Sequence, residues 1–281
     1  MSNIAPAALV EAPVRQPLPY GLLSVLQPRP NDGENRWMNG ITWETLGCDP
    51  VSGIGDVACE PGEDGTTQAT GLPKNLEKHA TPDPEFEAFT VYGTYTCTPV
   101  GNTLAHAQQR ATEHLMSGEE ARVEQAIWTG DLDNTGFAAG AEDAGAGSLL
   151  RAVANLEQWI AENLRAKGVI HMTREAALLG LAKDALEIKG NQIQTLLGTP
   201  VVAGSGYPGT GPAGEDPAAD STYVYATPAM TGYRSEVFPG ADQQGGFDRE
   251  KNNLTAVAER VYSVGWDACG TAFSLAALPE G

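Results

Sequence analysis

Residues 253–278 read NLTAVAERVYSVGWDACGTAFSLAAL, and residues 221–238 read STYVYATPAMTGYRSEVF. Both runs are dense in Val, Tyr, Ala and Thr, several of which suit a pleated, half-buried surface. A third run, TPVVAGSGY, starts at Thr199, and only polar, glycine-rich sequence separates the first two. These segments predict a carboxyl-terminal third that is built of strands and serves as architecture, with nothing in it that looks catalytic.

Length and composition favour a globular protein. The chain has 281 residues, of which 41% are hydrophobic, enough to bury a core in one large domain or two small ones. No apolar run reaches the roughly 18 residues that span a bilayer, and no basic region followed by an apolar core opens the chain. We therefore expect a protein that is neither embedded in a membrane nor exported by a signal peptide.

The charge balance is acidic. The chain carries 17 Lys and Arg against 36 Asp and Glu, which gives a formal net charge of -19. Affinity for nucleic acid comes largely from cationic side chains that release counterions, and this chain has no basic cluster to supply it. The composition therefore argues against direct nucleic-acid binding.

The amino-terminal region predicts an extended arm over residues 1–31. It is rich in Pro and Ala, and Pro28 and Pro30 exclude a regular helix there. The arm must fold against the rest of the chain or against a neighbouring molecule, because it cannot bury its own apolar residues. Those residues are Leu22, Leu23, Val25 and Leu26.

A long excursion separates the next two strand-like runs. The runs are RWMNGITWETLGC (36–48) and FEAFTVYGTYTCTPV (86–100). The acidic stretch between them contains Gly and Pro and is far too long for a hairpin turn. Two interpretations stay open: a floppy insertion, or an extended two-stranded flap that reaches a neighbouring subunit.

The middle of the chain has helical patterns. Residues 104–128 predict one long kinked helix or two in tandem, with Ser117 and Glu120 as a capping box. A loop rich in Gly and Ala leads to the clearest helix, over 148–168, with Gly168 as its stop. Residues 169–172 are a strand candidate, and Thr173 can cap a helix over 174–186.

The four cysteines predict no metal centre. They are Cys48, Cys59, Cys97 and Cys269, they form no CxxC pair, and the histidines nearest to them fall at no recognised ligand spacing. We expect reduced thiols. The alternative is a disulfide between Cys48 and Cys59, which flank a loop-like stretch.

Two motifs resemble known ligand-binding sequences. DLDNTGFAAGAE (131–142) approximates an EF-hand calcium loop, but position five is Thr135 in place of Asp or Asn. The sequence after Glu142 contains Gly145 and Gly147, which break the exit helix, so we expect a structural loop without a specific calcium site. GSGYPG, from Gly204 to Gly209, matches GxGxxG, but Pro208 and the sequence after it exclude the helix that a dinucleotide site needs. We expect a mobile surface loop.

Scattered polar residues predict no catalytic site. His79, His106, His114 and His171 lie apart in the sequence, and we expect His106 and His114 to be solvated. The spacing of Glu119, Glu120 and Glu124 fits a solvated helix face, although paired carboxylates are the alternative. The five tryptophans are best explained as core or interface anchors. They are Trp37, Trp43, Trp128, Trp159 and Trp266.

Several phrases resemble a known family. FEAFTVYGTYTCTPVGN (86–102), followed by a helix and EEARVEQAIWTGD (119–131), is similar to the passage from the extended loop into the spine helix of capsid proteins with the Hong Kong 97-type fold. TLLGTPVVAGSGYPG (195–209) and TAVAERVYSVGWDACG (255–270) are similar to their later sheet strands. The order and wording resemble the major capsid proteins of tailed bacteriophages of actinobacteria, over roughly residues 86–278.

The resemblance implies an α+β fold of Hong Kong 97 type with an N-terminal arm, an extended loop, a long spine helix, a peripheral domain and an axial domain. The implied ranges are the arm (1–31), the extended loop with flanking strands (32–101), the peripheral domain including the spine helix (102–147 and 241–281) and the axial domain (148–240). Relatives often begin with a scaffolding segment, whereas here the arm begins almost at Met1, which implies a separate scaffolding protein or none.

The implied function is that of a structural major capsid protein and not an enzyme, with no catalytic, cofactor or metal site. Copies would assemble as hexamers and pentamers in the host cytoplasm into the icosahedral head of a virion around double-stranded DNA. A portal, a scaffolding protein and a decoration protein are the implied partners. An acidic inner wall would repel the phosphates of the enclosed DNA.

Other functions stay open beside this one. The same fold serves the shells of bacterial encapsulin-type nanocompartments, which differ in enclosing a protein cargo, and a soluble acidic hydrolase is a third alternative. Some relatives crosslink subunits through Lys and Asn. No matching motif surrounds Lys74, Lys78, Asn252 or Asn253, so the resemblance does not carry this chemistry over.

Overall fold

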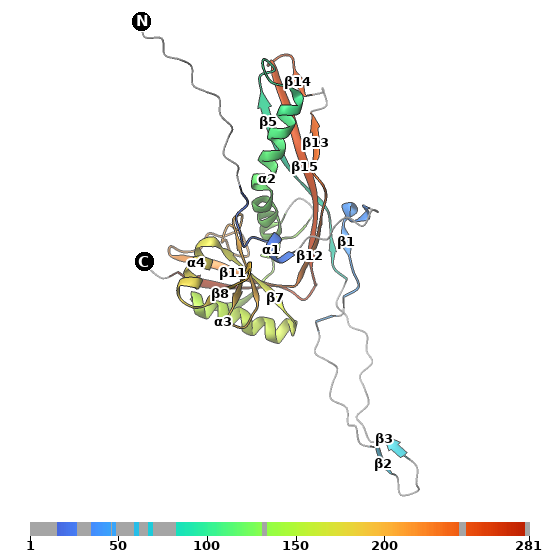
Figure 1. The fold of residues 1–281 in the computed structure, drawn as a ribbon. Coiled ribbons are helices and arrows are strands. Elements are labelled where there is room, and N and C mark those ends of the chain that lie inside the picture. The colour runs from blue at the N-terminus through green and yellow to red at the C-terminus, as the bar shows by residue number, and fades with distance from the viewer. Residues whose placement is uncertain are drawn as a thin grey trace.

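A long helix runs beside a long strand in one half of the molecule (Figure 1). The computed structural model describes residues 16–26, 35–45, 47–48, 59–61, 67–69, 83–130, 134–241 and 246–278. Helix α2 (Leu104–Thr129) packs against strand β15 (Asn253–Trp266). Strand β15 belongs to an antiparallel sheet in which each of the other four strands pairs with it. Those strands are β12 (Met230–Arg234), β13 (Phe238–Ala241), β14 (Phe247–Asp248) and β5 (Phe89–Cys97).

The alternating sequence of β15 explains how the sheet meets the helix. Every second side chain from Leu254 to Val264 is buried, as a strand with one covered face requires. Strand β5 brings its backbone very close to α2: a Cβ on Gly93 would lie 2.6 Å from the backbone nitrogen of Leu115, so glycine is required there. Together these elements enclose the first hydrophobic core.

A second core lies under a seven-stranded mixed sheet in the other half of the molecule. The strands follow the order β6 (Glu142–Ser148), β16 (Ala272–Ala277), β11 (Ser221–Pro228), β7 (Gly168–Thr173), β10 (Pro200–Gly204), β9 (Gln192–Thr195) and β8 (Leu186–Lys189). The pairs β6–β16 and β7–β10 are parallel, and the remaining pairs are antiparallel. Helices α3 (Leu149–Trp159) and α4 (Arg174–Ala182) pack on this sheet.

The helix boundaries correct two of the predictions. Helix α2 is one continuous helix, and its cap is Thr103, whose Oγ1 accepts a hydrogen bond from the backbone N–H of His106 at 3.1 Å. The predicted capping box is wrong, because Ser117 lies inside the helix, where its hydroxyl donates to the carbonyl of His114. The helix that follows Ser148 continues through a π-helical turn, η2 (Ile160–Leu164), and ends at Arg165, which has φ 51°.

Of the other predicted helices, strands and loops, some are confirmed and some are wrong. Gly168 begins β7 instead of ending a helix, whereas the strand over 169–172 and the Thr173 cap of α4 are confirmed. The predicted glycine- and alanine-rich loop before α3 is a strand, β6, which pairs with β16. The glycine-rich sequence between the two quoted runs also contains strands, β13 and β14.

The long excursion begins and ends in short strands. The described residues of the run 36–48 form a 3-10 turn, η1 (Arg36–Asn39), and a two-residue strand, β1 (Ile41–Thr42), in place of the longer strand predicted. Strand β1 pairs with β4 (Glu85–Phe86). Farther out, β2 (Cys59–Pro61) pairs with β3 (Thr67–Ala69) in an antiparallel ladder. This ladder lies well away from both sheets (Figure 1), so the two-stranded element of the predicted flap is present. Its contact with a neighbour stays a prediction.

The described part of the amino-terminal arm packs on its own chain. Helix α1 (Leu23–Leu26) is a single turn, and Leu22 and Leu26 are buried in the first core. The predictions on Pro28 and Pro30 lie outside the described residues. The proposed domain ranges stay a prediction as well, although β6 and β16, which they assign to the peripheral part, lie in the seven-stranded sheet.

Candidate functional site

The arm meets helix α2 at a place that we call the arm junction (residues 19–24, 119–124 and 203–207). Two carboxylates of α2 accept hydrogen bonds from the arm backbone: Glu124 Oε1 from Leu22 N–H and Glu120 Oε1 from Leu23 N–H, each at 2.9 Å. Hydrogen bonds from neutral donors to an ionised carboxylate are stronger than neutral pairs. The two glutamates therefore hold the arm to the helix.

The arm is bound to the seven-stranded sheet as well. The carbonyl of Tyr20 accepts from the N–H of Ala203 in β10 at 2.9 Å, and Nη1 of Arg174 donates to the carbonyl of Pro19 at 2.9 Å. Gln192 in β9 donates from its side chain to the carbonyl of Ser24 at 3.1 Å. The arm thus bridges α2, in the first core, and the sheet that covers the second core.

Glu124 is the buried centre of the arm junction. It has no exposed surface, and its Oε2 accepts from Gly206 N–H at 2.8 Å and from the Ser205 hydroxyl at 3.3 Å. Burial raises the pKa of Glu124 above its usual value of 4.5, and the hydrogen bonds that it accepts offset part of the rise. Burial likewise raises the pKa of Glu120, with a further rise from the charge of Glu124.

A buried ion pair involves Glu119, the residue just before Glu120 on α2. Nη1 of Arg260 in β15 donates to both oxygens of Glu119, at 2.7 and 2.8 Å. The two side chains are only 10% and 8% exposed, so each charge depends on the other in place of water. Burial, and next the charge of Glu119, raise the pKa of the neighbouring Tyr262.

A neutral histidine connects the aromatic side chains between the cores. His171 is fully buried, with Nε2 2.9 Å from Thr227 Oγ1 and Nδ1 2.7 Å from the Tyr207 hydroxyl. The Thr227 hydroxyl donates to the Pro228 carbonyl, so His171 donates through Nε2 and accepts from Tyr207 at Nδ1. Burial lowers the pKa of His171 to about 3. It is neutral and has no free nitrogen for acid–base chemistry.

These positions overturn two expectations. The three glutamates do not form a solvated helix face, because Glu119 and Glu124 are buried and Glu120 is half-buried. The motif from Gly204 to Gly209 is not a mobile surface loop. A Cβ on Gly206 would lie 1.8 Å from the Ala121 carbonyl oxygen, so this glycine is where the loop touches α2.

The remaining polar residues lie as follows. His106 and His114 are exposed, as expected, and His79 lies outside the described residues. Residues 131–133 of the calcium-like motif also lie outside them, and Glu142 begins strand β6, not the exit helix of a calcium loop. Across the described residues, no group of three or more His, Cys, Asp or Glu side chains could hold a metal ion.

The tryptophans pack as anchors. Trp37, Trp128 and Trp159 are buried, which confirms them as core residues. Trp43 and Trp266 are half-buried on either side of Phe86, with ring centroids at 5.9 and 4.8 Å from it. The beginning of the long loop is therefore packed on the end of β15.

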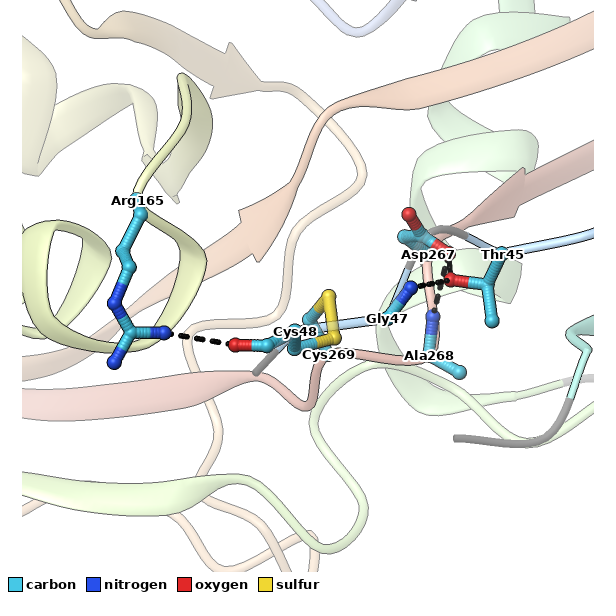
Figure 2. Close-up of a disulfide and its surroundings, with 7 residues drawn as sticks. All are labelled: Thr45, Gly47, Cys48, Arg165, Asp267, Ala268 and Cys269. Atoms are coloured by element: carbon cyan, nitrogen blue, oxygen red, sulfur yellow. Dashed lines mark hydrogen bonds between the residues drawn. A yellow bond between two sulfur atoms is a disulfide. The ribbon is translucent and has the colours of Figure 1, made fainter. Parts of the chain in front are cut away.

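A disulfide joins the beginning of the long loop to the residues just after β15. We call this region the loop root (residues 41–48, 83–86 and 267–269). Figure 2 shows the Cys48–Cys269 bond, which joins residues 221 positions apart. The Thr45 hydroxyl donates to Asp267 Oδ1 at 2.7 Å, and Nη1 of Arg165 donates to the Cys48 carbonyl at 2.8 Å (Figure 2). The expectation of reduced thiols is wrong for these two cysteines, and so is the alternative Cys48–Cys59 pairing.

Cys97 is a free thiol and is half-buried. Sequence reasoning missed Cys269 as a partner because its pairing depends on long-range topology. The DACG turn that contains it gives no local signal for a disulfide.

A cavity of about 680 Å³ opens beside the loop root, between residues 36–43 and β12. Its wall is largely aromatic, with Trp37, Trp43 and Tyr233. Arg36 and Asp267 are the charged residues among those described in its lining. Within the described ranges, no helix combines the length and the apolar character needed to cross a membrane.

The buried carboxylate of the arm junction has a testable consequence for pH dependence. A Glu whose pKa is raised on folding stabilises the fold most below about 4.5 and loses that contribution as pH rises through the folded pKa. Replacing Glu124 with Gln removes the titration. The difference in free energy of unfolding, Glu124→Gln minus wild type, should therefore increase as pH rises from about 4.5 to about 7.5. The increase is at most about 1.4 kcal/mol per pH unit.

Urea unfolding of both proteins across this pH range measures the difference between their free energies of unfolding, in which the contributions of the other titrating groups largely cancel. The charged and titratable groups that act on Glu120 or Glu124 are Glu119, Arg174 and Tyr207, and Tyr207 is hydrogen-bonded in turn to His171. Because His171 is neutral above about pH 3, it does not contribute in this window. The prediction is contradicted if the free energy of unfolding of Glu124→Gln, relative to that of wild type, stays constant or decreases as pH rises.

Comparison with known proteins gives structural likeness and no sequence likeness. No family model matches the chain, and no curated protein matches its sequence. A chain of the capsid of an empty GTA particle is similar at a TM-score of 0.53 and 14% identity, over 98% of this chain and 95% of that one. A chain from Microbacterium phage Oxtober96 is similar at a TM-score of 0.54 and 14% identity, over 98% and 96%.

A shell of another kind is equally similar. The SrpI encapsulin of Synechococcus elongatus PCC 7942 matches at a TM-score of 0.53 and 11% identity, over 95% of this chain and 91% of that one. The likeness extends over nearly the full length of each chain. It confirms that this chain has the Hong Kong 97-type fold, with mixed helices and sheets, as its sequence predicted.

Proposed function

We propose that this chain is the major capsid protein of a tailed bacteriophage, a structural subunit that assembles in many copies as pentamers and hexamers into an icosahedral shell. The observation that carries the proposal is the full-length match to a chain from a particle capsid. In this fold the role of the chain is geometric: subunits tile a closed surface. The arm junction and the loop root fit such a role, because they fix one part of the subunit relative to another.

The proposal also covers the domain ranges and the partners. The peripheral domain (102–147 and 241–281) contains α2 and β15, and the axial domain (148–240) contains five strands of the seven-stranded sheet. The shell encloses double-stranded DNA without sequence-specific contacts, which the formal net charge of -19 supports. Assembly takes place in the host cytoplasm, with a portal, a scaffolding protein and a decoration protein as partners.

The encapsulin-type shell is the second candidate, because the SrpI encapsulin matches as well as the GTA capsid does. The two functions differ in cargo. A capsid encloses DNA that resists added nuclease, whereas a nanocompartment encloses a protein bound to its inner wall. Isolation of native particles followed by nuclease treatment and mass spectrometry of the contents separates them.

We expect the expressed chain to form closed shells with fivefold and sixfold capsomers. A chain with this fold that leaves its β2–β3 ladder far from both cores gains contacts for that ladder only from other subunits. Light scattering and electron microscopy of the native and expressed protein measure the outcome. A strictly monomeric species in the lysate of infected cells, with no particle fraction, contradicts the proposal.

A further inference from the structure

We propose that the Cys48–Cys269 disulfide is a redox-responsive staple that fixes the root of the long loop. In this proposal the bond forms after the subunit has folded, by exchange with a small disulfide such as oxidised glutathione. Reduction frees the loop root and leaves both cores folded. The moment at which the bond would form during assembly rests on the proposed function, but the redox response itself does not.

The bond lies where three parts of the molecule meet: the long loop, the connection between β15 and β16, and the end of η2. Cys269 lies in the connection between β15, in the five-stranded sheet, and β16, in the seven-stranded sheet. Cys48 lies on the first leg of the long loop, and its carbonyl accepts a hydrogen bond from Arg165, just past the end of α3 and η2. One covalent bond therefore ties the loop to the crossover between the sheets (Figure 2).

Without the bond, the described residues of the loop root are held by the packing of Trp43 and Trp266 against Phe86, by one short ladder and by a few hydrogen bonds. The ladder between β1 and β4 has two residue pairs, Ile41 with Phe86 and Thr42 with Glu85. Beyond it, Thr45 makes the hydrogen bond to Asp267 and accepts one from Gly47, and its N–H donates to Asp83 Oδ1 at 3.1 Å. Hydrogen bonds at an exposed edge give little net stability, and a two-pair ladder opens readily. The reduced root should therefore open locally.

The chemistry balances without a metal or an enzyme. Both cysteines are half-buried, so a small disulfide can reach them. The thiolate of one cysteine attacks the small disulfide, forms a mixed disulfide and releases one thiol. The second thiolate then attacks the mixed disulfide, which forms the Cys48–Cys269 bond and releases the second thiol. Two protein thiols are oxidised and one small disulfide is reduced to two thiols, with the two protons passing to solvent or to the released thiolates.

The topology excludes one competing partner within a subunit. Cys97 pairs in register with Leu254, at the opposite end of β15 from Trp266. Twelve residues of extended strand separate those ends by about 40 Å. Cys97 therefore cannot take the place of either staple cysteine and is the natural control. Cys59 lies eleven positions after Cys48 in the loop, so its thiol is best removed before the test.

Hydrogen–deuterium exchange on free subunits tests the staple. Subunits with Cys59→Ser are compared after treatment with oxidised glutathione and after treatment with dithiothreitol. We expect peptides that cover residues 35–45 to exchange at least about threefold faster in the reduced state, with α2 and the centre of β15 unchanged. Adding Cys269→Ser should give the fast exchange in both conditions, whereas adding Cys97→Ser should leave the redox response intact.

Two results would overturn the staple: equal exchange at the loop root in both redox states, or alkylation of Cys48 and Cys269 after oxidation. Both arms use free subunits and do not depend on assembly. If the redox response occurs and no shell is ever found, the staple stands and the proposed function fails. If shells form and the exchange does not change, the staple fails and the proposed function stands.

Discussion

Replacing Arg260 with Met is expected to lower the free energy of unfolding by about 3–5 kcal/mol. The substitution keeps an apolar side chain of similar length in β15 but leaves the Glu119 carboxylate buried without its partner, at 7% exposure. An uncompensated charge in a core is costly, and here the neighbouring Glu120 adds like charge. Urea unfolding of free subunits, followed by circular dichroism, measures the loss.

Two further variants separate the charge effect from loss of packing. The double variant Glu119→Leu, Arg260→Met removes both charges, so we expect it to recover most of the loss. The matched control is Arg110→Met, which breaks an exposed pair on the same helix: Arg110 and Glu113 lie 2.6 Å apart with side chains 39% and 47% exposed. Exposed pairs contribute little, so a change of less than about 1 kcal/mol is expected. Equal losses at Arg260 and Arg110 contradict the assignment.

Much of the fold could be predicted from local patterns. The strands β5, β10, β11 and β15 coincide with runs rich in β-branched and aromatic residues. The resemblance then supplied the Hong Kong 97-type fold, which the structural likeness confirms, whereas the domain ranges stay a prediction. Prediction was poorer where tertiary pairing decides the structure. The Gly- and Ala-rich residues 142–148 have weak strand propensity and become a strand through parallel pairing with β16.

The functional junctions were harder to predict, because their charged residues follow tertiary contacts. The spacing of Glu119, Glu120 and Glu124 is compatible with solvent, and nothing local shows that the arm and the loop after β10 cover this face. Arg260 did give a signal. It occupies an inward position in the alternation of β15, and a charged residue there requires a buried partner. Following that rule to the helix would have identified Glu119.

Shortening the β2–β3 hairpin should sharply reduce the yield of shells without unfolding the subunit. Deletion of residues 62–65 removes four of the five residues that connect Pro61 to Thr67, which pair in the ladder, so the hairpin can no longer close in its present register and its reach is shortened. The ladder lies away from both cores (Figure 1), so the free subunit loses little packing. In a closed shell each copy would lose the same contact, and weak contacts repeated around a shell act together.

We expect the shell yield of the deletion variant to fall by at least about tenfold, with an unchanged circular dichroism spectrum of free subunits. Electron microscopy and sedimentation measure the yield, and limited proteolysis of wild-type shells should show the loop protected relative to free subunits. Replacing Glu63 and Asp64 with Ser keeps the length and removes two charges. We expect assembly to depend on the length of the hairpin and not on these two charges, so this control should still assemble. Normal shells from the deletion variant, with equal loop cleavage in shells and in free subunits, would show that the excursion is a passive insertion and not a contact between subunits.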